Sequence, residues 1–481
     1  MEIIMEKPNI ILITTDQQRF DTIQALGNNK IFTPHLNWIL TEGIAFTRCY
    51  ADCPICVPSR TTIMTGKKGY KTGITDNMDH SSVMKNNPTL PQILTQNGYQ
   101  TKAVGKMHFE PPRANYGFED MELPLDYIRL HNKNQDKALP KAHGCGECEL
   151  EPVISTVHEN DSITKWIVDQ TIDFIETRDD TSPFFVWTSF TKPHPPFDPC
   201  MDYWMLYNTE DMPEPIYGNW SENIDTMKKG FLYQTYRFTN MYRYDINQIK
   251  AIRRAYYANI TQIDYALGLL YSRLQELNLL DDSWIIFTSD HGEMLGDHHM
   301  GQKILFNEGS AHIPLLVKPP KSVYGQLSGT KVDRLAELSD ITVTILNAAG
   351  IDTSQYEMDG QNLLELLDQN DDRLFYGTSE NINFCVMENN IKYIITRYGG
   401  QELLFDLNND PMEKDDLSDD QNYVDIKEHL RKKMMDYIMQ YSPELVKDGR
   451  LELLPVPQSE RDVKDKWFGF HSNQYKYDVL H

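Results

Sequence analysis

The sequence predicts an α/β fold, with a large mixed, mostly parallel sheet sandwiched by helices. Four apolar runs rich in β-branched and aromatic residues support this prediction, and they span residues 9–15, 101–104, 184–190 and 284–289. Continuous apolar strands are typical of a sheet that is buried on both faces. Helical stretches lie between the runs, and one of them covers residues 250–278, so strands and helices alternate along the chain.

Each of the four runs leads into polar residues of catalytic type. The groups are, in chain order, Asp16 with Gln17, Lys106 with His108, His194, and Asp290 with His291. In open α/β sheets, ligands bind beyond the carboxyl ends of the strands. All four groups fall at such ends, which indicates an enzyme with its site at this edge of the sheet.

The chain changes character after about residue 370, which predicts a catalytic domain at 1–370 and a small α+β subdomain at 371–450. Within the subdomain we expect an antiparallel sheet that carries one helix. The expected elements are short strands joined by tight turns, then a helix, at residues 374–379, 385–396, 401–407 and 425–441. The polar, aromatic tail at 451–481 is expected to pack on the body.

Composition limits the partners that the chain can have. Its 481 residues are 40% hydrophobic and 24% charged, and the formal net charge is −24. This charge argues against binding of nucleic acid or long polyanions, so an anionic substrate is expected to be small. No apolar stretch is long enough to span a bilayer, so no membrane partner is expected. The N-terminus lacks a basic region and a cleavage site, which indicates a cytoplasmic protein, or a periplasmic one if the N-terminus is trimmed.

The cysteines do not suggest a disulfide framework. There are seven of them, an odd number, spread through the chain at positions 49, 53, 56, 145, 148, 200 and 385. Cys145 and Cys148 form a single CxxC pair with His143 close in sequence. A zinc site usually needs a second pair or histidines nearby. A metal or redox role and a pair of free thiols in a loop both remain open for this segment.

The most specific segment begins at Cys56. It has the form Cys-x-Pro-Ser-Arg from Cys56 to Arg60 and is followed by Thr65 and Gly66. Alone, Cys56 would be interpreted as a partly buried cysteine on a turn. With its neighbours in register, the segment resembles the maturation signal of the type I sulfatases, in which a maturation enzyme oxidises the cysteine to formylglycine.

Further motifs follow in the order found in this family. They are Gly105-Lys106-x-His108, Pro193-His194-Pro195-Pro196, Asp290-His291-Gly292-Glu293, Gly301-Gln302-Lys303 with Glu308, Asp340-Ile341, and Phe405-Asp406-Leu407 through Asp410-Pro411. The resemblance extends from Asn9 to about Leu417. It implies an alkaline-phosphatase-like fold and a sulfuric ester hydrolase, with a formylglycine nucleophile made from Cys56 by a formylglycine-generating enzyme.

The resemblance also implies a divalent metal, held by Asp16, Gln17, Cys56, Asp290 and His291. Hard oxygen ligands suit Ca²⁺ or Mg²⁺. The commonest family pattern has a second aspartate at position 17 and often asparagine at position 291. This variant instead resembles choline sulfatases and phosphonate monoester hydrolases, and it admits Mn²⁺. Without these partners, Asp16 would be interpreted as a strand-end or turn aspartate.

The family resemblance assigns roles to the remaining polar residues. One hydroxyl of hydrated formylglycine attacks sulfur, and the second hydroxyl expels sulfate and restores the aldehyde. Arg60 and Lys106 would hold the diol, and His108 would be the base for the release step. His194 would be the acid that protonates the leaving alcohol, and Lys303 would bind the sulfate oxygens. The alternative interpretation of His194 is a histidine in a proline-rich surface turn, and that of Lys303 is a solvated lysine.

Three functions remain open at this point. The favoured one is a sulfatase acting on a sulfated carbohydrate, such as a glycosaminoglycan-derived mono- or disaccharide with a 2-O-sulfated uronic acid; aryl sulfates are further substrates. The second is a phosphonate monoester or phosphodiester hydrolase, motivated by Gln17 and His291. The third is a non-catalytic protein that binds sulfated glycans. His298, His299 and Gln302 are expected near the substrate loop, and His312 is expected to be structural.

Overall fold

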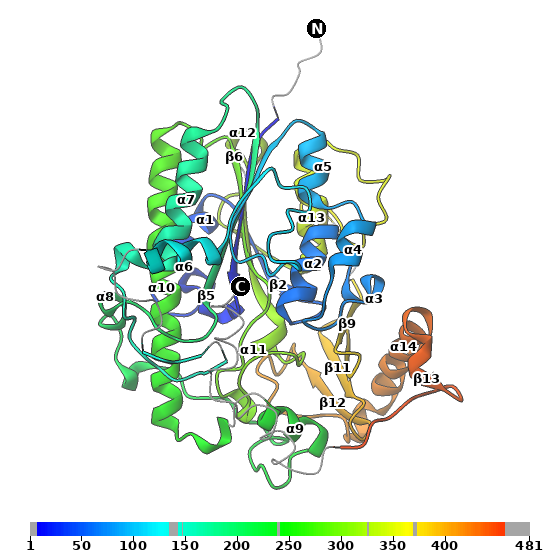
Figure 1. Cartoon of the computed structure of the whole chain (residues 1–481). Coiled ribbons are helices and arrows are strands. Elements are labelled where there is room, and N and C mark those ends of the chain that lie inside the picture. Colours follow the sequence, from blue (N-terminus) through cyan, green and yellow to red (C-terminus); the bar gives the residue numbers. More distant parts are fainter. Residues whose placement is uncertain are drawn as a thin grey trace.

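An eight-stranded mixed sheet forms the centre of the molecule (Figure 1). The computed structural model describes residues 7–133, 143–146, 148–237, 241–324, 327–368 and 373–456. The strands are β1 (Asn9–Asp16), β2 (Ile44–Tyr50), β3 (Gln100–Gly105), β4 (Asp120–Glu122), β5 (Phe184–Pro193), β6 (Ser283–Ser289), β7 (His312–Lys318) and β8 (Thr330–Glu337). Their spatial order is β4-β3-β5-β1-β6-β7-β2-β8.

The sheet is mostly parallel, as the sequence predicts. From β4 to β6 every neighbouring pair is parallel, and β1 lies between β5 and β6. Strand β7 runs antiparallel to both β6 and β2, while β2 and β8 are parallel. Because parallel strands point the same way, the ends of β1, β3, β5 and β6 meet at one edge of the sheet.

Helices cover both faces of the sheet, on the left and right of the view in Figure 1. Alternate residues of β1 enter different cores, Ile10 and Leu12 on one face and Ile11 and Ile13 on the other. The first face packs against α2 (Cys56–Thr65), α5 (Leu90–Gln96) and α13 (Leu338–Ala348). The second packs against α1 (Pro34–Thr41), α7 (Ile163–Thr177) and α10 (Ile246–Glu276). Burial on both faces explains why the central strands are continuously apolar.

Further helices lie in the connections between these elements. They are α3 (Gly69–Thr72), α4 (Ser81–Asn86), α6 (Pro124–Lys133), α8 (Met201–Trp204), α9 (Lys229–Arg237), α11 (Glu308–Ala311) and α12 (Lys321–Tyr324). In the described part of the chain, no helix combines the length and the apolar character that crossing a membrane requires.

A second, antiparallel sheet lies at the lower right of Figure 1. Its strands are β9 (Phe375–Ser379), β10 (Asn383–Glu388), β11 (Ile391–Thr396) and β12 (Gln401–Asp406), and helix α14 (Val424–Tyr441) packs on it. A two-stranded ribbon of β13 (Val446–Lys447) and β14 (Arg450–Leu451) follows. The predicted small antiparallel sheet with one helix is confirmed.

One strand prediction in this sheet is wrong. The expected strand at 385–396 is a hairpin, in which β10 pairs antiparallel with β11. Asn389 and Asn390 form the turn, with φ of 52° and 63°. Asparagine tolerates this left-handed conformation, which a type I′ hairpin turn requires at both central positions. Strand-forming residues stand on both sides of this short polar turn, so the sequence alone reads as one strand.

The small sheet is joined to the main body by a buried charged contact and an aromatic core. The Lys392 ammonium on β11 lies between the carboxylates of Glu308 and Glu413. Phe306 of the main body and Phe375 of β9 lie in the same apolar cluster.

The domain boundary expected near 370 falls at residues 369–372, outside the described residues, and stays a prediction. The tail is described to Val456, where Leu454 bridges to Tyr398, and residues 457–481 lie outside the description.

Candidate active site

Cys56 lies at the first turn of α2, directly beside the ends of the central strands. Helix α2 spans Cys56–Thr65, so Cys56 is its first residue. Every residue of the helix is buried, and Gly66 ends it with φ of 66°. The Val57 N–H donates to the Asn77 side-chain oxygen at 3.1 Å. A helix N-terminus favours negative charge, so this turn suits an anionic group on residue 56.

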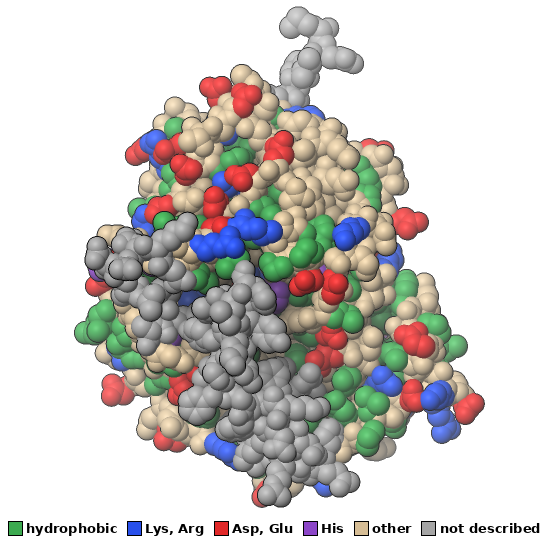
Figure 2. Space-filling view, in the orientation of Figure 1, with side chains coloured by type: hydrophobic (Ala, Val, Ile, Leu, Met, Phe, Trp, Pro, Cys, Tyr) green, Lys and Arg blue, Asp and Glu red, His purple; other side chains and the backbone are tan. Residues whose placement is uncertain are grey.

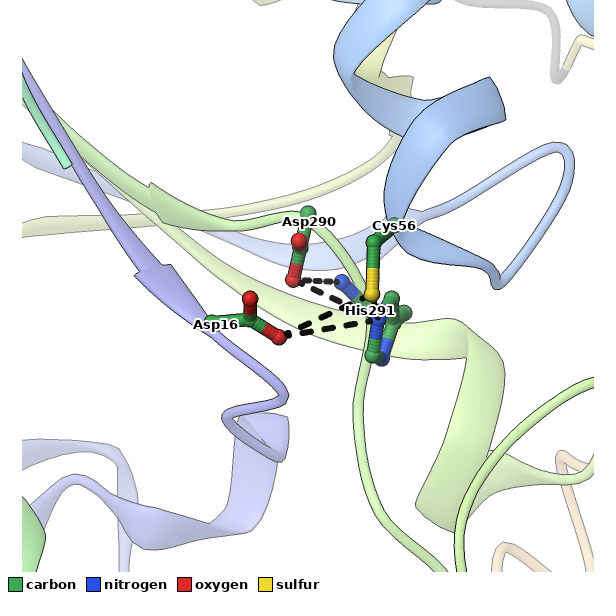
Figure 3. A group of neighbouring side chains, drawn as sticks. All are labelled: Asp16, Cys56, Asp290 and His291. Atoms are coloured by element: carbon green, nitrogen blue, oxygen red, sulfur yellow. Dashed lines mark hydrogen bonds and ion pairs between the residues drawn. The ribbon is translucent and has the colours of Figure 1, made fainter. Parts of the chain in front are cut away.

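Four residues that the sequence assigns to a metal come together around this turn (Figure 3). Asp16 ends β1, Asp290 and His291 follow β6, and Cys56 enters from α2. One potential ligand atom from each residue lies within 4.8 Å of all the others, and all four residues are buried. The Cys56 Sγ lies 3.2 Å from His291 Nε2 and 3.9 Å from Asp16 Oδ1. In formylglycine, an oxygen on Cβ would stand in the place of this sulfur.

Gln17, the fifth expected ligand, contacts the same group of residues through its backbone and through Lys303. Its backbone adopts φ of 72° directly after β1, and its N–H donates to Asp290 Oδ1 at 3.0 Å. The Lys303 ammonium donates to Gln17 Oε1 at 2.8 Å and to Cys56 Sγ at 3.2 Å. Lys303 therefore links the expected ligand to the expected nucleophile.

Arg60 and Lys106 neutralise the carboxylates of the site. The Arg60 guanidinium lies 2.9 Å from Asp290 and 3.4 Å from Asp16. Its remaining N–H groups donate to the Lys106 carbonyl at 2.6 Å and to Ser189 Oγ at 2.8 Å. The Lys106 ammonium forms an ion pair with Asp16 and lies 3.9 Å from Cys56 Sγ. Lys106 thus contacts both Asp16 and residue 56, whereas Arg60 pairs with the two carboxylates.

The electrostatics of the site favour an anion at residue 56. Burial and the Asp16 carboxylate oppose ionisation of the thiol, yet Lys106, Lys303 and His291 hold the pKa of Cys56 well below its usual value. Burial likewise opposes ionisation of Asp16, but the neighbouring cations, led by Lys106, keep its pKa well below the ordinary one. Burial and the Asp16 charge raise the pKa of Asp290. Asp16 therefore ionises more readily than Asp290.

The structure places the two histidines assigned to proton transfer differently. His194 follows β5 and is partly buried, and its Nδ1 lies 2.9 Å from the Pro195 carbonyl. Burial, Lys106 and Lys303 lower its pKa to about 3 in the ligand-free protein, so the ring is neutral near pH 7. His108 is exposed, with φ of 59°; burial, with His108 nearby, lowers the pKa of His80.

Three further histidines contact other parts of the fold, and they are His298, His299 and His312. The His298 Nδ1 lies 2.8 Å from Ser221 Oγ, and burial lowers the pKa of His298 to about 4. His299 stacks on Tyr217, with the ring centroids 4.3 Å apart. His312 is buried between the rings of Phe20 and Tyr50, and its Nδ1 lies 2.7 Å from a Glu308 carboxylate oxygen. These contacts agree with a structural role.

The CxxC segment approaches the site from outside. Gln302 Nε2 donates to the Cys148 carbonyl at 3.3 Å, and His143 binds the Asp198 carboxylate at 3.1 Å. All seven cysteines carry free thiols. The structure thus places this loop next to the segment that carries Lys303.

Two residues of the site have no role in the sequence-based assignment. The Tyr256 hydroxyl of α10 donates to the Gln17 carbonyl at 2.6 Å, and no local pattern marks it. Glu293 is fully buried behind Gln17. It belongs to the Asp290–Glu293 motif, and its place three residues after a metal-site aspartate is the signal that could have singled it out.

Known proteins are similar to this chain over most of its length. The sequence profile described as "Sulfatase" matches residues 8–351, and the profile "N-sulphoglucosamine sulphohydrolase, C-terminal" matches residues 296–440. An arylsulfatase of Clostridium perfringens is 31% identical over 463 residues, covering 89% of this chain and 93% of its own length. An N-acetylglucosamine-6-O-sulfatase of Bacteroides thetaiotaomicron is 26% identical over 76% of this chain and 71% of its own length.

A solved structure shares the fold. The crystal structure of a phosphonate monoester hydrolase of Agrobacterium radiobacter superposes with a TM-score of 0.76 at 24% identity, over 90% of this chain and 96% of its own. The family profile covers well over half of the chain, and the arylsulfatase aligns along most of both sequences. The chain is therefore a sulfuric ester hydrolase that belongs to the sulfatase family, within the alkaline phosphatase superfamily.

Proposed function

We propose that the protein hydrolyses a sulfate ester of a small sulfated carbohydrate, with formylglycine at position 56 as nucleophile and a divalent metal beside it. The observation that carries the proposal is the convergence of two carboxylates, His291 and the Lys303 ammonium on the Cys56 side chain. Formylglycine, made by a maturation enzyme, would supply a hydrated aldehyde with one hydroxyl to attack sulfur and another to expel sulfate.

The donor set fits a divalent cation. A cation with ligands at about 2.3–2.6 Å holds opposite ligand atoms at most about 5 Å apart, and the four ligand atoms here lie within 4.8 Å of one another. Two carboxylates and the Gln17 amide oxygen suit Ca²⁺ or Mg²⁺, while the His291 nitrogen also suits Mn²⁺. When bound, the metal would lower the pKa of a hydroxyl at residue 56 and so supply a nucleophile near neutral pH.

Two lysines of the chain face the sulfate position. Lys303 and Lys106 lie 3.2 and 3.9 Å from the Cys56 Sγ. Preorganised cations of this kind stabilise charge that grows on the sulfate oxygens in the transition state. Arg60 keeps the two carboxylates in place from behind. These groups bind and orient the ester, so that the oxygen at residue 56 can approach sulfur.

His194 is proposed to donate the proton to the leaving alcohol. Burial, together with the charges of Lys106 and Lys303, lowers the pKa of His194 to about 3 in the ligand-free protein. An anionic sulfate ester that neutralises these two lysines removes the repulsion and favours the protonated ring. His108, exposed after β3, is proposed as the base of the release step.

Charge and relatives support a small sugar substrate. The net charge of −24 disfavours long polyanions, and acidic side chains are spread over the described part of the face in Figure 2, with Lys and Arg between them. The matching C-terminal profile and one relative bear the names of an N-sulphoglucosamine sulphohydrolase and an N-acetylglucosamine-6-O-sulfatase. We propose a glycosaminoglycan-derived mono- or disaccharide, such as one with a 2-O-sulfated uronic acid.

A second candidate is hydrolysis of a phosphonate monoester or phosphodiester. Two residues at the metal position favour it, the neutral Gln17 and the nitrogen ligand His291. The same nucleophile can attack phosphorus, and the superposed phosphonate monoester hydrolase shares the fold.

Initial-rate measurements on matured protein separate the two candidates. The panel consists of sulfated disaccharides that differ in sulfate position, 4-nitrophenyl sulfate, and a phenyl phosphonate monoester, with Cys56→Ala as the control. The proposal predicts that kcat/KM is highest for one sulfated sugar and that Cys56→Ala abolishes turnover of all substrates. A higher kcat/KM for the phosphonate ester would establish the second candidate, and turnover of neither class would reject both.

A further inference from the structure

A buried carboxylate stands directly behind the expected ligand Gln17. Glu293 is fully buried, and one of its oxygens accepts the backbone N–H groups of Leu295 and Gln302. The other oxygen accepts the Nε2–H of Gln17. One side chain thus joins Gln17 to both ends of the segment 295–302, which precedes Lys303.

These contacts determine which way the Gln17 amide faces. An amide side chain has a donor end and an acceptor end. Glu293 and the Gln302 side-chain oxygen, 3.3 Å away, both accept from Nε2. The Lys303 ammonium can only donate, and it lies 2.8 Å from Oε1. Acceptors on one side and a cation on the other therefore select the same orientation, with the oxygen toward Lys303, which itself contacts residue 56.

The backbone of Gln17 is held equally firmly, so the side chain is the part left to orient. Its N–H donates to Asp290 Oδ1 at 3.0 Å, and its carbonyl accepts from Tyr256 at 2.6 Å. The opposite amide orientation would direct an N–H donor at Lys303 and at the metal position. That arrangement would remove one oxygen ligand and add repulsion between donors.

We propose that Glu293 is a positioning residue, which holds the Gln17 amide with its oxygen toward the metal position and Lys303. The inference rests on the proposed metal-dependent function. Here a carboxylate stands one hydrogen bond behind the neutral Gln17 side chain. Glu293 acts through Gln17, as partners behind a ligand generally fix its orientation.

Exchanging the carboxylate of Glu293 and the amide of Gln17 tests the inference. In Glu293→Gln, the oxygen that accepts from Leu295 and Gln302 can be kept, so the introduced N–H₂ faces Gln17. The Gln17 amide must then rotate to accept from it. In the double variant Gln17→Glu/Glu293→Gln, the introduced carboxylate accepts from that N–H₂ and still presents an oxygen to Lys303.

The readout is the affinity of the metal-stripped full chain for Mn²⁺, measured by isothermal titration calorimetry. We expect Glu293→Gln to raise the Kd at least tenfold, in line with the effect of losing a partner behind a ligand. We expect the double variant to return the Kd to the wild-type value or below it. Glu337→Gln, which also removes a buried glutamate but lies away from the metal position, is expected to leave the Kd unchanged.

Unfolding curves without metal separate misfolding from mispositioning. The double variant must unfold as cooperatively as wild type. An unchanged Kd in Glu293→Gln, or a folded double variant that binds no better than the single one, would overturn the inference. In either case wild type that binds Mn²⁺ and hydrolyses a sulfate ester leaves the proposed function standing. Wild type that does neither would overturn the proposed function and the inference together.

Discussion

Replacement of Lys303 by methionine tests the electrostatics around residue 56 most directly. Methionine keeps the length of the side chain and removes its charge. In the unmodified, metal-free protein the Lys303 ammonium lies 3.2 Å from the Cys56 sulfur. Lys303 is one of three groups that hold the pKa of this thiol well below its usual value.

The size of the effect follows from this distance. At an effective dielectric constant of about 20, two charges 3.2 Å apart interact by about 5 kcal/mol. This is an upper limit of about 4 pKa units. Lys303 is partly exposed, and solvent screening reduces the value, so we expect Lys303→Met to raise the pKa of Cys56 by about 2 units. Lys106, at 3.9 Å, remains to stabilise the thiolate.

Thiolate absorbance near 240 nm, followed as a function of pH, measures this pKa, with Cys56→Ser as the blank. Lys85→Met, which removes an exposed lysine from α4, is the matched control and should leave the titration unchanged. If the pKa of Cys56 in Lys303→Met lies within about 0.5 unit of the wild-type pKa, the assignment of Lys303 to the anion at residue 56 is refuted.

Three further predictions concern the leaving group, the metal and stability. His194→Ala should slow hydrolysis of sugar sulfates by about 10²–10⁴-fold, and that of 4-nitrophenyl sulfate far less, because a good leaving group needs no acid; equal losses in kcat on both substrates would contradict the role of His194. Chelation should abolish turnover and lower the free energy of unfolding by about 4 kcal/mol, relative to protein with free metal at about 1,000 times its Kd. Turnover and stability should recover together when Ca²⁺ or Mn²⁺ is restored. Turnover that persists after chelation would count against the metal. Burial raises the pKa of Asp52 to about 6, above about 3.9 in the unfolded chain, so Asp52 costs about 3 kcal/mol of stability at pH 8 that is regained between pH 6 and 4. In urea unfolding, the stability at pH 4 minus that at pH 8 should therefore be lower in Asp52→Asn than in wild type by about 3 kcal/mol. An equal value in the two proteins would show that Asp52 does not take up this proton.

The sequence predicts the main sheet well, because burial on both faces leaves a continuous apolar pattern in β1, β5 and β6. It predicts the hairpin of β10 and β11 poorly. The two strands read as one, since the turn at Asn389 and Asn390 adds only two polar residues to an otherwise strand-like run.

The sequence also predicts which residues meet at the site, but not how they are oriented. Motifs at strand ends are enough to expect Asp16 near Asp290, because parallel strands share an edge. The partner of Gln17 is 276 positions away at Glu293, and only the folded chain shows that contact. The same holds for Arg60, whose N–H groups reach Ser189 and the Lys106 carbonyl.

Peptide mass spectrometry across residue 56 tests the central claim most directly. The protein is co-expressed with a formylglycine-generating enzyme, and each preparation is assayed for sulfate release from the sulfated disaccharides. The account predicts the mass of formylglycine at position 56 and sulfate release in proportion to the modified fraction. Cysteine that persists under conditions that mature a control sulfatase, or sulfate release that does not depend on the modified fraction, would contradict it.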